Sequence, residues 1–231
     1  MSVNDLVLLQ GMRDTRKTLG AWDRQPWPVL RGWLLGSAVI IAILLIGVWI
    51  VARFSTPDIT PFSVLGLDRR GTPRDIGVVL YRNSLVLALH AMACVAGFIA
   101  GSSLPLSAAR RSGVWRWVHD KAGPLAIAFV VCATTFSLGT QIYIIGANTA
   151  TISAQLGISP ATLLLSYLPH AIPELLAVFL PLAAWLIASR RGDWEQLLAA
   201  TFVTVAIAVP VLVLSASIEV YGSPELLRLL I

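Results

Sequence analysis

Charged residues are scarce in this chain, at 13% of its 231 positions. A soluble globular domain carries about 25%. Hydrophobic residues make up 57% of the chain, and the mean hydropathy is +0.79. This shortage of charge excludes a protein whose whole surface meets water, and it indicates that much of the surface faces lipid.

Cysteine is also scarce. The two cysteines, Cys94 and Cys132, lie inside apolar runs, so we interpret them as small buried hydrophobic groups and not as a disulfide framework. The sequence also lacks a nucleotide-binding loop, a nucleophile elbow and the Cys and His spacing of metal sites. We therefore expect no cofactor and no bound metal, and we do not favour an enzyme.

Long apolar runs dominate the rest of the chain. A membrane-spanning helix needs about 20 apolar residues, and the runs that reach this length lie at about 33–52, 84–106, 122–145, 161–189 and 197–220. Because a backbone in lipid must satisfy its own hydrogen bonds, we expect all of them to be helices. The sequence thus predicts an all-α, polytopic membrane helix bundle with about five transmembrane helices over residues 33–231. An N-terminal segment, residues 1–32, precedes it and contains a short amphipathic helix.

Lys and Arg are unevenly divided between the two sides of such a bundle. With the N-terminus cytoplasmic, 11 of the 17 fall on the cytoplasmic side and 6 on the other. Cytoplasmic segments carry the excess of these residues. We therefore expect a multi-pass protein of the cell membrane with a cytoplasmic N-terminus, an extracytoplasmic C-terminus and an extracytoplasmic loop at about 54–82. The net charge of +5 is spread over several segments, so we expect the lipid bilayer, and no nucleic acid, as a partner.

The connection between the third and fourth runs carries no charge. No Asp, Glu, Lys or Arg occurs from Ala122 to Pro173, and the linking residues at 146–160 are polar but neutral. An exposed turn can have this composition. A loop that dips into the membrane would need this uncharged composition, together with protein or water around its backbone. Both interpretations stay open.

Two ionisable residues of the fourth run, His170 and Glu174, are the main candidates for function. An intramembrane charge costs roughly 2.5–3.5 kcal/mol on insertion scales, so such residues usually have a partner or a role. Four residues apart, they share one face of a helix. Pro169 and Pro173 flank the pair and remove backbone donors, so we expect this helix to be kinked or broken. Broken helices with polar residues often build ion or substrate sites.

Packing is the competing interpretation of this pair. His170 and Glu174 could bond to each other or to Asn83 and Asn148 on neighbouring helices. His90, alone on its apolar helix, fits a packing role. Gly97 and Gly101 have the small-xxx-small spacing that allows close helix approach.

Four elements resemble the stage II sporulation protein M family of membrane proteins. They are Leu-Tyr-Arg-Asn-Ser-Leu at 80–85, Asn148, Leu-Pro-His-Ala-Ile-Pro-Glu-Leu at 168–175, and Ile-Glu-Val-Tyr-Gly-Ser-Pro at 218–224. The resemblance covers roughly residues 80–224. It implies a polar cluster of Asn83, Asn148, His170, Glu174 and Glu219. The chain departs from the family at Thr149 and Ala171, where glycine is usual.

The resemblance implies a non-enzymatic membrane scaffold that supports an envelope or cell-wall remodelling complex. Its partners would be other membrane or envelope proteins, or a second copy of the chain. One alternative is a channel or transporter-like subunit with its polar site at His170 and Glu174. A less favoured alternative is an intramembrane metal-dependent hydrolase that uses these two residues with Glu219.

Overall fold

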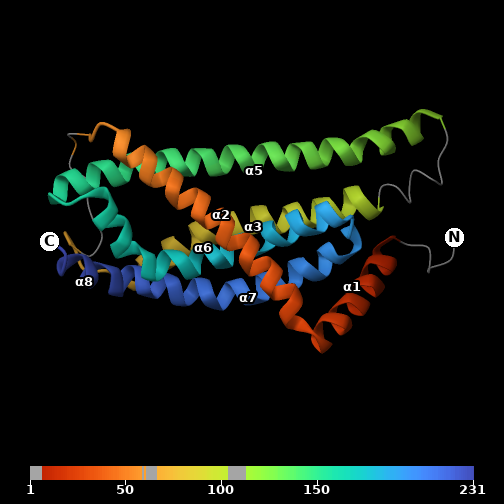
Figure 1. Cartoon of the computed structure of the whole chain (residues 1–231). Helices are drawn as coiled ribbons and strands as arrows, with labels where there is room; N and C mark the ends of the chain where they lie inside the picture. Colours follow the sequence, from red (N-terminus) through yellow and green to blue (C-terminus); the bar gives the residue numbers. More distant parts are fainter. Residues whose placement is uncertain (1–6, 59, 61–66, 104–112) are drawn as a thin grey trace. The chain divides into compact units, whose positions relative to one another are not determined.

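A computed structural model describes residues 7–58, 60, 67–103 and 113–231 (Figure 1). The described residues form helices and no β-strand. Helices long and apolar enough to cross a membrane occupy Pro26–Phe54, Pro73–Gly101, Ile127–Leu156, Pro160–Arg191 and Trp194–Arg228. The predicted all-α bundle with about five transmembrane helices is therefore confirmed, and the architecture is that of a multi-pass membrane protein.

The helix bounds differ from the lengths of the apolar runs. The helical elements, in chain order, are α1 (Val7–Arg24), α2 (Pro26–Phe54), α3 (Pro73–Phe98), η2 (Ile99–Ser103), α5 (Gly113–Leu156), α6 (Pro160–Arg191), η3 (Trp194–Gln196), α7 (Leu197–Ser217), η4 (Ile218–Gly222) and α8 (Ser223–Arg228). Each of α2, α3, α5 and α6 extends beyond the apolar run that predicts it at one or both ends, and the last span does so through η3, η4 and α8, which flank α7.

The connection expected at 146–160 is shorter than predicted, because α5 continues to Leu156 and only residues 157–159 separate it from α6. Helix α5 continues to Leu156, and polar side chains near its end bond to the backbone of the same helix. Thr151 Oγ1 donates to the Ala147 carbonyl at 3.2 Å, and Ser153 Oγ to the Ala150 carbonyl at 3.0 Å. The helix then ends at Gly157, whose φ of 69° suits glycine.

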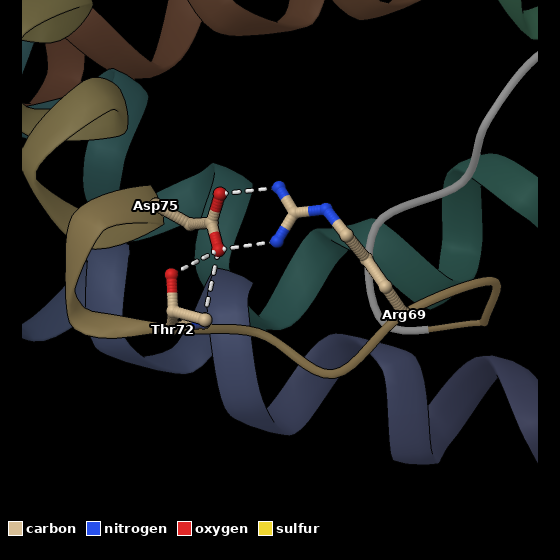
Figure 2. Close-up of polar contacts among 3 residues, drawn as sticks. All are labelled: Arg69, Thr72 and Asp75. Carbon is tan, nitrogen blue, oxygen red and sulfur yellow. Dashed lines mark hydrogen bonds and ion pairs between the residues drawn. The ribbon is translucent and has the colours of Figure 1, made fainter.

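The loop expected at 54–82 is also shorter than predicted, because α3 begins at Pro73. Asp75 caps this start through one half of a capping box, in which its carboxylate accepts from the backbone amide of Thr72, as Figure 2 shows. Its Oδ2 accepts from the Thr72 amide at 2.9 Å and from the Thr72 hydroxyl at 2.7 Å. Arg69 donates to both carboxylate oxygens of Asp75, at 2.5 and 2.8 Å, and this contact raises the pKa of Arg69.

The expected break in the fourth long helix does not occur. Helix α6 is a continuous α-helix from Pro160 to Arg191, with Pro169 and Pro173 inside it. Its ribbon bends in the teal N-terminal part (Figure 1). A proline removes one backbone bond and crowds the preceding turn, which bends a helix without ending it when the neighbouring bonds remain.

Within the described residues, two one-turn π-helices interrupt the α-helical pattern. Ile99–Ser103 follows α3, and Ile218–Gly222 joins α7 to α8. Such turns are rare and are frequent at functional sites. The second one carries Glu219, which makes its surroundings a candidate site.

The chain divides into two compact units, which we describe separately. Unit 1 comprises Met1–Ser37, Val86–Ala133 and Val178–Ile207, and unit 2 comprises Ala38–Leu85, Thr134–Ala177 and Ala208–Ile231. Each of the long helices α2, α3, α5, α6 and α7 contributes residues to both units.

Unit 1 has an apolar core that includes Trp33, Leu180, Ala184 and Ala200. The ring of Trp22 meets that of Trp33 edge to face, with centroids 5.1 Å apart. His90 is buried in the same unit, and its Nδ1 donates to the Val178 carbonyl at 3.0 Å. This contact satisfies the His90 ring in the way that a packing histidine requires.

Gly97 and Gly101 of unit 1 make room for large side chains. A Cβ on Gly97 would lie 2.7 Å from Leu197 Cδ1 and 2.8 Å from Trp185 Nε1. A Cβ on Gly101 would overlap the side chain of Trp194. The spacing predicts that two helices come close together, but here the two glycines are contacted by side chains, mainly those of tryptophans.

Gly97→Ala is expected to destabilise the protein by about 1–3 kcal/mol, because the added methyl group overpacks this contact. Thermal unfolding of the purified protein in detergent measures the effect. Gly139→Ala in α5 is the matched control, since a Cβ there meets nothing within 4 Å; as an exposed helical alanine it should be neutral or stabilising. Equal midpoints for the two variants would contradict the packing at Gly97.

Candidate functional site

Unit 2 contains a cavity of about 510 Å³. This volume is within the range of small-molecule sites, about 300–1,000 Å³. Of its 20 lining residues, 13 are apolar. The others are Asp75, Arg82, Tyr167, His170, Glu174, Glu219 and Ser223. A mostly apolar wall with a few converging polar groups is the usual composition of a ligand pocket.

Helix α6 supplies one wall of the cavity. Tyr167, His170 and Glu174 are three and four residues apart, so they lie along one face of the helix. His170 is 8% exposed, and its Nδ1 is hydrogen-bonded to Ser223 Oγ at 2.6 Å. The Tyr167 ring contacts the His170 ring nearly edge to face, with centroids 5.7 Å apart. His170 is therefore held by Ser223 and Tyr167, and does not bond to Glu174.

Glu174 is the polar residue of the cavity whose bonding is incomplete. Its Oε2 is buried and has no hydrogen-bond partner, and the same is true of Asn83 Nδ2. The Asn83 amide lies near the Glu174 carboxylate and interacts with it, although not in the geometry of a full hydrogen bond. Leaving such a group unsatisfied costs about 1–3 kcal/mol, and more for a charged group. A binding role for Glu174 would account for this cost.

Glu219 places a second carboxylate at the cavity, from the π-helical turn η4. It acts electrostatically on Glu174 and on Tyr167. The positive charge of Arg82 on α3 acts in turn on Glu219. The two acids therefore differ in surroundings, because Glu219 has a basic neighbour while Glu174 faces another acid and an amide.

The structure brings together four of the five polar residues of the predicted cluster, namely Asn83, His170, Glu174 and Glu219. Asn148 is part of α5 and does not line the cavity. Pro169 and Pro173 adjoin the pair on α6 but do not line it either, and Gly97 and Gly101 belong to unit 1.

Sequence reasoning missed four polar lining residues, which are Asp75, Arg82, Tyr167 and Ser223. A signal existed for Tyr167, which precedes His170 by three residues and so shares its helical face. Arg82 and Ser223 lie inside the quoted family-like segments at 80–85 and 218–224, but nothing in the sequence marks them as neighbours of His170 or Glu219.

The donors at the cavity do not form a metal site. Within the described part of the chain, no three or more His, Cys, Asp or Glu side chains are grouped closely enough to hold a metal ion. His170, Glu174 and Glu219 line one cavity but are not grouped as a set of metal ligands.

Comparison of the chain with protein-family models, curated proteins and solved structures finds no match. The function of the cavity is therefore argued from its geometry and from the residue pattern alone. The geometry can position a ligand against two carboxylates, an imidazole and a phenol inside a largely apolar wall.

Proposed function

We propose that the protein is a channel or transporter-like membrane subunit that takes a small solute into the unit 2 cavity. The observation that carries the proposal is the buried, unpartnered Glu174 Oε2 at a cavity of about 510 Å³. A cluster that served packing alone would have its polar atoms paired and its space filled, since interiors are close-packed.

Glu174→Gln should lower solute flux about tenfold, because it removes the unpaired charge at nearly constant volume, and a lost charge-assisted contact is worth about 1.5 kcal/mol or more. Uptake of potassium and of methylammonium by proteoliposomes measures the flux. Glu195→Gln, an exposed position in unit 1, is the matched control. Flux that is the same in wild type and Glu174→Gln, or no flux above empty liposomes, would contradict the proposal.

A membrane scaffold of the stage II sporulation protein M type is the second candidate. The residue pattern at 80–85, 168–175 and 218–224 supports it. Its partners would be envelope proteins, and the cluster around His170 would then hold the helices in a fixed arrangement. The scaffold predicts that defined proteins co-purify with the chain after mild detergent extraction at native expression. A chain that always runs alone would count against it.

We also propose that the protein lies in the cell membrane with its N-terminus in the cytoplasm. The excess of Lys and Arg in the N-terminal segment and near Arg190 and Arg191 supports this orientation. In a cysteine-free background, Thr56→Cys should react with an impermeant maleimide in intact cells, while Glu195→Cys should react only after lysis. Both positions are exposed. The reverse labelling pattern would overturn the orientation.

A further inference from the structure

We propose that the ligand of the unit 2 cavity is a monovalent organic cation, an ammonium group carried on an apolar body. This inference rests on the proposed function, because it names the class of solute that the same cavity takes. It comes from the charge balance of the cavity and from the composition of its wall.

The charge balance leaves one acid without a base. Asp75 is paired with Arg69 through two hydrogen bonds. Glu219 has the charge of Arg82 acting on it. Among the described residues, no basic side chain pairs with Glu174, whose electrostatic neighbours are Glu219 and Asn83. The ionised cavity therefore carries one uncompensated negative charge, which a ligand with a single positive charge would neutralise.

His170 does not pair with the carboxylate of Glu174. Its Nδ1 is engaged with Ser223 Oγ at 2.6 Å, and its ring packs against Tyr167. These contacts direct the imidazole toward α8 and the preceding turn of α6, so the carboxylate of Glu174 stays available to a ligand.

The wall of the cavity favours an organic cation over a bare metal ion. Thirteen of its 20 lining residues are apolar, including Leu44, Val48 and Ile152. Such a wall gains by burying hydrocarbon, at about 25 cal/mol per Å², but offers few oxygen ligands to an inorganic ion. Tyr167 adds an aromatic ring to the same wall, and aromatic rings attract ammonium groups.

Two sources share this ligand chemistry. One is a free amine or quaternary ammonium compound, and the other is the amine headgroup of a membrane lipid. Both place an ammonium group beside an apolar chain, so both satisfy Glu174 and the apolar wall.

Calorimetric titration of the full-length protein in detergent with hexyltrimethylammonium tests the proposal. Hexanoate and hexanol have the same chain length but a negative or no charge, so they control for partition into micelles. We expect saturable binding of the cation alone. Glu174→Gln should weaken it about tenfold or more, and Arg82→Gln should strengthen it, because it removes the charge that offsets Glu219. Glu195→Gln should bind as wild type.

Opposite effects of two substitutions keep the test independent of folding, since a misfolded variant could not bind more tightly. No saturable cation binding, or hexanoate binding that is lost in Arg82→Gln, would overturn the ligand class. If flux depends on Glu174 but no organic cation binds, the transport proposal stands and the ligand class is wrong. If the cation binds but no flux is measured, the ligand class stands and the transport proposal is wrong.

The same titration in nanodiscs distinguishes the two sources. One set contains phosphatidylglycerol alone, and the other adds phosphatidylethanolamine. Weaker binding of the probe in the second set would identify the lipid amine as an occupant. Equal binding would identify a free amine. Either result supports the ligand class, provided that Glu174→Gln weakens binding of the probe in both sets of nanodiscs.

Discussion

Burying a charged or hydrogen-bonding group in hydrocarbon is costly, and the rest of this structure depends on that cost. It makes the spanning segments helical, because only a helix satisfies its own backbone in lipid. It also favours a partner for each buried polar side chain, as the bonds of His90 to Val178 and of His170 to Ser223 illustrate. Several buried polar atoms of the described residues have no partner, and among them Glu174 Oε2 is the one that belongs to the wall of the cavity.

The number of helices was predictable because it follows from the length of each apolar run. Their ends were not, because the length of an apolar run does not mark where a helix ends. Helix α5 continues into a segment whose composition indicates a loop, and Thr151 and Ser153 there bond to the backbone of their own helix. Asp75 starts α3 early, by accepting hydrogen bonds from Thr72. The sequence also does not show that α6 continues through Pro169 and Pro173. Each proline removes one backbone hydrogen bond, and whether the neighbouring bonds of the helix form depends on the packing around it.

The site was predictable only where its residues share a helix. The spacing of His170 and Glu174 places both on one face, and both line the cavity. Ser223 is 53 residues from His170, so their contact depends on tertiary structure. Asn148 shows the reverse case, a residue that belongs to the family-like pattern but does not line the cavity. The order of motifs along a chain does not show which of them meet in space.

The central claim is that α6 and the C-terminal turn meet at one polar cavity. Thiol cross-linking in native membranes tests it most directly, in a background without Cys94 and Cys132. The combined substitutions His170→Cys and Ser223→Cys should be joined by a short bifunctional thiol reagent that replaces the length of the lost imidazole ring, because the side chains of His170 and Ser223 are in hydrogen-bond contact. The pair His170→Cys and Tyr221→Cys should not, since Tyr221 is exposed and does not line the cavity. Cross-linking of the second pair and not the first would contradict the account.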